Sequence, residues 1–160
     1  MVDWANLAKE ISQKSEIVLL PAAPQLLAAS QQLGIPDDAI AFFSEFEPAQ
    51  CAEIEDVRLW PLQEVLAENT DYVPGCYIVQ HGYVVFATTI FGDAFCFDTK
   101  TASGQEVPIV LIAHDGYNWD AVTAEEIARL KKPIAADFRG FLQNYVDGML
   151  DIQPNYDPLP

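Results

Sequence analysis

The side chains that could perform catalysis in this chain are few, apart from its carboxylates. The only histidines are His81 and His114, and no G-x-S-x-G sequence is present to expose a nucleophilic serine. His114-Asp115 is the smallest pair from which a metal site could be built, but such sites draw on several further histidines. The simpler interpretations are a polar hairpin residue for His81 and, for His114, a ring that hydrogen-bonds a loop backbone. We therefore expect no metal centre.

Paired carboxylates for general acid–base catalysis could be drawn from Asp93, Asp98 and Asp115. In a chain with 24 acidic residues, however, such pairs also arise by chance. A small hydrolase that uses His114 with Asp115 or Asp98 is therefore kept only as a minor alternative. The pattern of acidic residues assigns no catalytic residue.

The cysteines and glycines indicate no cofactor. Cys51, Cys76 and Cys96 are spaced for neither a zinc site nor a disulfide framework. Cys76 and Cys96 fall inside predicted strands and are expected to be small buried hydrophobic residues. The glycines stand singly at turns, and neither glycine-rich phosphate-binding motif is present. The sequence thus favours a binding module over an enzyme.

The charge of the chain is strongly negative and unevenly distributed. There are 24 acidic and 8 basic residues, which gives a net charge of −16. Between Ser15 and Thr99 there are 13 acidic residues and a single base, Arg58. Such a field repels nucleic acid and anionic membranes and attracts a basic protein, so we expect neither a nucleic-acid nor a membrane partner. Solubility alone would explain the charge equally well.

The elements that must position these residues begin with a predicted antiparallel meander of about four strands between Tyr72 and His114. Gly82, Gly92-Asp93 and Ser103-Gly104 separate its strands. The β-branched and aromatic residues crowd most densely in Val84–Phe91, as a buried strand requires. The apolar runs are Cys76–Val79, Tyr83–Phe91, Ala94–Phe97 and Val107–Ala113.

Predicted helices precede this meander. Trp4–Ile11 has helical periodicity with Asp3 as its N-cap, and Gly34 ends a second helix at Leu33. A third helix begins at Asp37 and carries Phe42, Phe43 and Phe46 on its apolar face. Residues 45–56 are expected to be a connection to a short strand, Val57–Trp60. Pro61 then opens a helix over Leu62–Glu68 that Asn69 closes.

Helices also follow the meander. Thr123–Glu126 is a capping box, and the helix dipole is a sufficient reason for Arg129, Lys131 and Lys132 near the end of that helix. The last helix is expected to run from Ile134 to Tyr145, and Gly148 ends it. Helices, then antiparallel strands, then helices predict an α+β fold with a central antiparallel or mixed sheet of about four to six strands. We expect one domain over residues 1–148 and a surface tail over 149–160.

Five segments, in this order, resemble the SUKH superfamily, the domain also found in yeast cell-wall synthesis regulators. Each segment alone is a fold signature of caps, turns and core positions, and their order carries the resemblance. They cover roughly residues 33–142. They are residues 33–43 (LGIPDDAIAFF), 59–65 (LWPLQEV), 92–98 (GDAFCFD), 107–115 (VPIVLIAHD) and 134–142 (IAADFRGFL).

The resemblance implies a non-enzymatic protein-binding domain. Most bacterial members look like immunity proteins that bind and neutralise a toxin, often a nuclease, and eukaryotic members act as regulatory modules. A nuclease grips phosphates with a basic cleft, which an acidic surface can fill. The expected function is therefore neutralisation of a basic toxin, with a regulatory or scaffold role as the alternative. From charge density, the partner surface is placed at Glu45, Glu47, Glu53, Glu55 and Asp56, with Asp93 nearby.

The expected location is the cytoplasm. Neither end of the sequence has a charged segment followed by an apolar leader segment. No apolar run approaches the roughly 18 residues of a membrane span.

Overall fold

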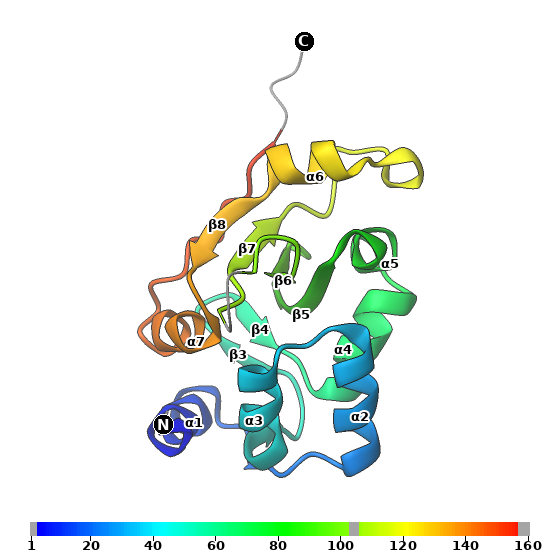
Figure 1. The fold of residues 1–160 in the computed structure, drawn as a ribbon. Helices are drawn as coiled ribbons and strands as arrows, with labels where there is room; N and C mark the ends of the chain where they lie inside the picture. Colours follow the sequence, from blue (N-terminus) through cyan, green and yellow to red (C-terminus); the bar gives the residue numbers. More distant parts are fainter. Residues whose placement is uncertain (1–2, 103–105, 157–160) are drawn as a thin grey trace.

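The computed structural model describes residues 3–102 and 106–156. Its helices are α1 (Trp4–Ser15), α2 (Pro24–Leu33), α3 (Asp37–Phe46), α4 (Leu62–Thr70), α5 (Gly75–Ile78), α6 (Ala124–Leu130) and α7 (Phe138–Val146), with short 3₁₀ turns η1 (Val79–His81) and η2 (Trp119–Ala121). Its strands are β1 (Leu19–Leu20), β2 (Glu47–Pro48), β3 (Ala52–Ile54), β4 (Val57–Leu59), β5 (Tyr83–Thr89), β6 (Ala94–Asp98), β7 (Ile109–Ile112) and β8 (Lys132–Ala135). Figure 1 shows these elements.

The sheet at the centre of the molecule has six strands in the order β3-β4-β5-β6-β7-β8. Every neighbouring pair in it is antiparallel, so the chain forms an uninterrupted meander. Strands β1 and β2 form a separate two-stranded ribbon. With helices from both ends of the chain around the sheet, the fold is α+β, as the sequence predicts (Figure 1).

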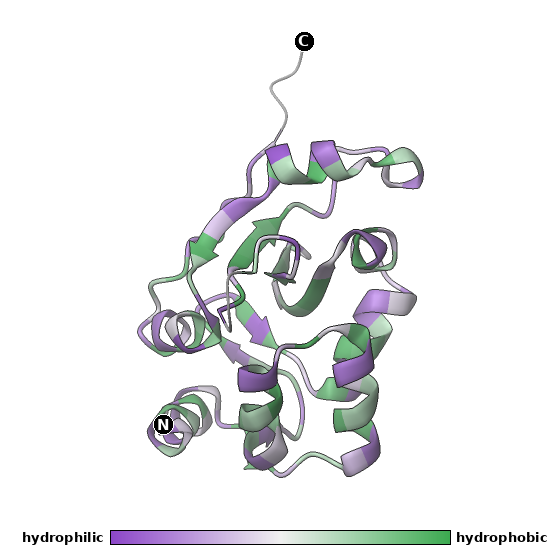
Figure 2. Cartoon of the chain, viewed as in Figure 1, coloured by the Kyte–Doolittle hydropathy of each residue, from purple (hydrophilic) through white to green (hydrophobic). Residues whose placement is uncertain are grey.

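The central strands are buried on both faces, because helices cover each side of the sheet. On one face, the core contains residues of α1, α3, α4 and α7, including Phe42, Phe43, Phe138 and Phe141. On the other face, α5, η2 and α6 cover a smaller cluster around Cys96. Every residue of β5, β6 and β7 is therefore buried. In Figure 2 the green colour of β7 and of much of β5 shows the same apolar centre.

The structure corrects four expected strand and helix positions. Cys76–Val79 is helical, since it forms α5 and the start of η1, so Cys76 is half-buried in a helix and His81 lies at a helix-to-strand junction. The expected connection 45–56 contains the edge strand β3. Asn69 lies inside α4, which continues to Thr70. Ile134 belongs to β8, because Asp137 caps α7 and starts that helix only at Phe138.

Two lysines have partners more specific than a helix dipole. Lys131 forms an ion pair with Asp98, and Lys132 lies in β8 and pairs with Asp151. The predicted cap Thr123 does accept a hydrogen bond from the Glu126 backbone N–H.

The turn expected at Ser103-Gly104 lies outside the described residues. Within the described part of the chain, no helix is long and apolar enough to cross a membrane.

Candidate functional site

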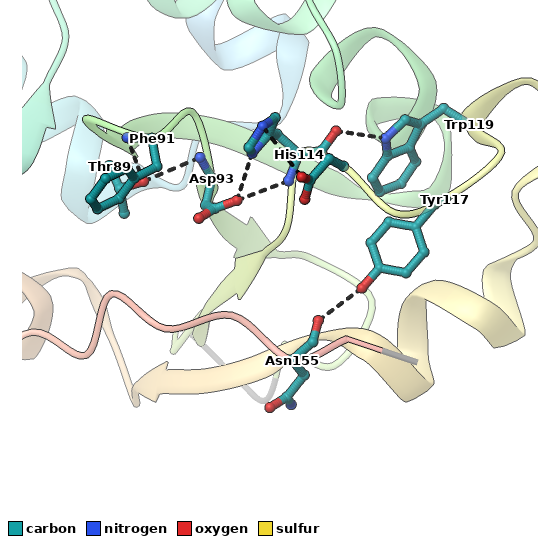
Figure 3. A network of polar contacts seen from close by, with 8 residues as sticks. Thr89, Phe91, Asp93, His114, Tyr117, Trp119 and Asn155 are labelled. Carbon is teal, nitrogen blue, oxygen red and sulfur yellow. Dashed lines mark hydrogen bonds and ion pairs between the residues drawn. The ribbon is translucent and has the colours of Figure 1, made fainter. Parts of the chain in front are cut away.

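The turn between β5 and β6 meets the end of β7 at a small polar network (Figure 3). Thr89, the last residue of β5, accepts hydrogen bonds at its Oγ1 from the backbone N–H groups of Phe91 (3.3 Å) and Asp93 (3.2 Å). Gly92 has a φ of 96° and donates its N–H to the Thr89 carbonyl (3.0 Å). The glycine supplies the left-handed conformation of this turn, and Thr89 fixes its shape.

Asp93 joins this turn to the end of β7. Its carboxylate is buried, and its Oδ1 accepts a hydrogen bond from the backbone N–H of His114 at 3.0 Å and contacts the ring Nδ1 of His114 at 2.8 Å. The expectation that the His114 ring bonds loop backbone was therefore wrong, because a carboxylate 21 residues away holds the ring. Two contacts to one oxygen fix both the backbone and the side chain of His114.

The loop after β7 is held from its other side. The Trp119 indole N–H donates to the His114 carbonyl (3.0 Å), and the Tyr117 hydroxyl donates to the Asn155 carbonyl (2.8 Å). The ring of Tyr117 also lies near-parallel to that of Tyr156, with 6.5 Å between centroids. The chain after α7 therefore packs on this loop, as Figure 3 shows for Asn155.

Among the described residues, the ligands that a metal ion could take here come from Asp93, His114 and Asp115. Their ligand atoms lie within 4.8 Å of one another. The Nδ1 of His114 is already used by Asp93, which leaves the Nε2, 3.9 Å from the Asp115 Oδ2, as the free ring nitrogen. Because the Asp93 Oδ1 is engaged by His114, the Nε2 of His114 and the Asp115 carboxylate are the two protein ligands that remain, fewer than the three or four of established zinc sites. The donor set therefore does not fit a resident metal.

The network also lacks a partner for nucleophilic catalysis. A hollow of about 300 Å³ beside it is lined by Phe91, Asp93, His114, Ile152, Gln153, Pro154 and Tyr156. No serine or cysteine is among these described lining residues, so the aspartate–histidine pair has no nucleophile to activate. What the pair does is hold the β5–β6 turn against the end of β7.

The third carboxylate considered for acid–base chemistry lies elsewhere. Asp98 ends β6 at the end opposite to Asp93 and is buried. Its Oδ2 contacts the Lys131 ammonium at 2.6 Å, and Thr101 donates its hydroxyl to the same oxygen at 2.8 Å. The hydrogen bond and the charge of Asp98 outweigh burial and raise the pKa of Lys131. This is a structural ion pair, and it is not brought together with His114.

Three of the acidic residues chosen from charge density share the β3–β4 hairpin. Glu53, Glu55 and Asp56 are all exposed. Glu55 (φ 47°) and Asp56 (φ 67°) form the turn, and Glu53 pairs with Arg58 at 2.9 Å. The Asp56 carbonyl accepts a hydrogen bond from the Ile90 N–H (2.9 Å), so this hairpin adjoins the β5–β6 turn. We call Glu53, Glu55 and Asp56 the acidic hairpin.

The other three residues have different environments. Glu45 is exposed near the end of α3. Glu47 is half-buried, and its Oε2 accepts a hydrogen bond from the Leu62 N–H at 2.8 Å, which caps the start of α4. Asp93 lies in the β5–β6 turn, which adjoins the acidic hairpin through the hydrogen bond between Ile90 and Asp56. Its carboxylate, however, is only 3% exposed and is bonded to His114. Glu47 and Asp93 thus support the fold around the acidic surface.

The family of the chain follows from a comparison with protein-family models. The model described as SMI1 / KNR4 family (SUKH-1) matches residues 22–144, well over half of the chain. The chain belongs to this family. The matched range contains all six strands of the central sheet. A comparison with curated proteins found no significant match.

Family membership narrows the kind of function. SUKH domains are known as non-enzymatic binding domains, and the family includes toxin-immunity proteins. Protein–protein interaction is thus the mode of action that the family suggests.

Two exposed rings of this SUKH-1 domain escaped prediction from sequence. Phe91 is 58% exposed and Tyr72 is 54% exposed. Phe91 continues an apolar run that predicts a buried strand, yet β5 ends two residues earlier, at Thr89. The only sequence feature that could have predicted the exposure of Phe91 is its position directly before Gly92-Asp93, because a turn can expose the residue that precedes it.

Proposed function

We propose that this SUKH-1 domain is an immunity protein, which binds and neutralises a basic, nuclease-type toxin of a bacterial competition system in the cytoplasm. The observation that carries the proposal is the one-signed charge of the middle of the chain. This chain belongs to a family that includes immunity proteins, and between Ser15 and Thr99 it has 13 acidic residues and a single base. A basic catalytic cleft is the natural complement of such a surface.

The acidic hairpin is the part of this surface that we assign to the partner. Its three carboxylates are exposed on one short hairpin, Glu53 on β3 and Glu55 and Asp56 on the turn, where they can approach a partner without unfolding any element. Arg58, the single base of the region, is paired with Glu53 and so adds little repulsion. Glu45 is exposed as well and is kept as an outer member of the surface.

The proposal is tested with the nuclease domain of any toxin that a neighbouring gene encodes. The full chain is titrated into the purified nuclease domain while nucleic-acid cleavage is measured, and the dissociation constant is determined by calorimetry. Stoichiometric loss of cleavage is expected, with an affinity that falls as salt rises, because the charges on the two surfaces are screened. Undiminished cleavage at saturating chain would overturn the proposal.

The same acidic surface also suits a second function. A regulatory or scaffold module of this fold would bind a basic cellular protein unrelated to toxins. Genome context separates the two, since an adjacent reading frame with a long, repeat-bearing toxin architecture is expected only for an immunity protein. A neighbourhood without any toxin gene would favour the regulatory role.

A further inference from the structure

A second hollow lies beside Phe91, where the β5–β6 turn faces the segment between α4 and α5. Its volume is about 300 Å³. Because it extends from β4 to the β5–β6 turn, we call it the 58–92 cleft. Its lining includes three aromatic rings, two further apolar side chains and two charged ones: Trp60, Tyr72, Phe91, Val73, Ile90, Arg58 and Glu68.

Three apolar side chains in the lining of the 58–92 cleft are strongly exposed. Phe91, Tyr72 and Val73 are 58%, 54% and 47% exposed. Exposed apolar side chains that gather at one hollow mark an interaction site more often than isolated ones do. Aromatic rings, in particular, are frequent anchors of binding energy at protein interfaces.

The rings of the cleft are presented by a fixed scaffold. Phe91 projects from the turn that Thr89 and Asp93 hold, and Asp93 is itself anchored to His114. On the wall of the cleft, the Trp60 indole N–H donates to the Thr88 hydroxyl at 2.9 Å. Because these backbone segments are already ordered, a partner would bind here at a low entropic cost. The polar network of Figure 3 thus acts as the support of an exposed ring.

The charges around the cleft favour a cation. Of its two charged lining residues, Arg58 is neutralised by Glu53 at 2.9 Å. Glu68 is half-buried, and no described residue forms an ion pair with its carboxylate. Burial, followed by the neighbouring charge of Glu64, raises its pKa. Asp71, beside Tyr72, and the acidic hairpin, beside Ile90, add exposed negative charge at the rim.

We propose that the 58–92 cleft binds a lysine or arginine side chain of a protein partner together with an apolar side chain next to it in the partner. The cation would contact the faces of Phe91 and Tyr72 and donate to the Glu68 carboxylate. The apolar neighbour would cover the exposed surface of Val73. This inference rests on the proposed function and names the place at which a basic partner engages.

A small peptide tests the cleft without any toxin. The ¹⁵N-labelled full chain is titrated with N-acetyl-Phe-Arg-amide and, as a matched probe, N-acetyl-Phe-Glu-amide. The arginine peptide is expected to shift the Trp60 indole signal and the backbone signals of Tyr72 and Phe91. In the variants Phe91→Ala and Glu68→Gln its affinity should fall about five-fold or more. Unchanged thermal unfolding of each variant shows that the fold is intact.

Matched control variants lie outside the lining. Leu20→Ala removes an apolar side chain that is also exposed, at 55%, and Glu125→Gln removes an exposed charge on α6 that does not act on Glu68. Both should bind the arginine peptide as the unmodified chain does. Equal binding of the glutamate peptide, or shifts that map to another surface, would overturn the inference. So would concentration-dependent shifts without peptide, since these would show that a second copy of the chain occupies the cleft.

The toxin domain then separates this inference from the proposed function. If the unmodified chain neutralises the toxin and the double variant Tyr72→Ala/Phe91→Ala does so equally well, the cleft is not the contact and only the inference fails. If the unmodified chain does not bind the toxin but the arginine peptide maps to the cleft, the immunity function fails and the inference stands. Loss of neutralisation in the double variant, with Leu20→Ala unaffected, supports both.

Discussion

The side chain of Asn69, in α4, hydrogen-bonds both polar backbone groups of Val85, in β5. Its Oδ1 accepts from the Val85 N–H and its Nδ2 donates to the Val85 carbonyl, each at 2.8 Å. The register of β5 against β6 shifts between Val85 and Ala87, which leaves Phe86 as an extra residue in the strand. Asn69 thus pairs buried backbone groups at this irregularity and ties α4 to the sheet.

Replacement of Asn69 by leucine is therefore expected to lower the free energy of unfolding by about 3 kcal/mol, because two buried backbone groups lose their partners. Urea unfolding followed by circular dichroism measures the change. Thr70→Ala, at the exposed neighbouring position, is the control and should cost less than about 1 kcal/mol. A loss for Asn69→Leu as small as that of the control would show that water replaces the asparagine.

Much of the fold was predictable because local chemistry and tertiary structure agree there. Asp3 caps α1 and Gly34, with a φ of 113°, ends α2, as the sequence predicts. Phe42 and Phe43 are fully buried in the core. The turn at Gly92-Asp93 connects β5 and β6 of the antiparallel sheet. Caps, glycine turns and apolar periodicity are local signals, and all of them can be seen without knowing the neighbours.

The positions that were predicted wrongly depend on distant partners. Asparagine is common at helix ends, but in this chain Asn69 lies inside α4, where its side chain bonds the backbone of Val85. Cys76 belongs to an apolar run that fits a strand, yet the run forms a helix over the second face of the sheet. Ile134 has the right spacing for α7, but it pairs in β8. Short apolar runs do not distinguish helix from strand.

The candidate site was predictable only in part. The carboxylates of the acidic hairpin are exposed as a charged surface requires, since Glu55 and Asp56 occupy a turn. The pairing of Asp93 with His114 joins residues 21 positions apart and has no sequence signal. Charge density therefore pointed to carboxylates that are exposed, and their role in binding stays a prediction, whereas the cleft beside them could be seen only in three dimensions.

Strongly alkaline pH is expected to destabilise the fold through Tyr145 and Lys131. Burial raises the pKa of Tyr145, and Asp98 raises that of Lys131 against the opposing effect of burial. Unfolded tyrosine and lysine lose their protons near pH 10 and 10.4, roughly, while the folded groups still hold them. Protons are thus released on unfolding, so the free energy of unfolding falls as pH rises above about 10, by at most about 1.4 kcal/mol per pH unit for each group.

The variant Tyr145→Phe isolates one of these groups. At neutral pH it should cost about 1 kcal/mol, because the Tyr145 hydroxyl no longer donates to the Ala52 carbonyl. Above pH 10, roughly, its unfolding free energy should fall less steeply than that of the unmodified chain. Urea unfolding between pH 8 and pH 12, at about one-unit steps, measures both slopes, with Tyr72→Phe on the exposed surface as control. Parallel slopes for Tyr145→Phe and the unmodified chain would contradict the assignment.

The Asp93–His114 pair is expected to support the β5–β6 turn and to take part in no reaction. Asp93→Ala removes the acceptor of the His114 backbone N–H and should cost about 2 kcal/mol, whereas His114→Ala leaves that bond in place and should cost about 1 kcal/mol. Both should shift the backbone signals of Phe91 in ¹⁵N spectra. A hydrolytic activity of the purified chain that His114→Ala abolishes without unfolding would favour the hydrolase alternative instead.

Charge reversal on the acidic hairpin should weaken toxin binding. Glu53→Lys and Glu55→Lys are each expected to cost about 1 kcal/mol of binding free energy, roughly a five-fold rise in dissociation constant, if the two residues lie at the rim of the interface. Glu125→Lys, at an exposed position of α6, changes the net charge equally and serves as control. Its smaller effect would separate the local contact from the general field of the chain.

The salt dependence of these variants decides between contact and steering. A rim contact should make the loss largest at low ionic strength and nearly abolish it at about 1 M salt, where the screening length is about 3 Å. Association rates measured by stopped flow should fall more than dissociation rates rise, as for other rim charges. Glu53→Lys also breaks the ion pair with Arg58, so Glu53→Gln is included to separate that loss from repulsion. Unchanged affinity of Glu55→Lys at low salt would remove the acidic hairpin from the interface.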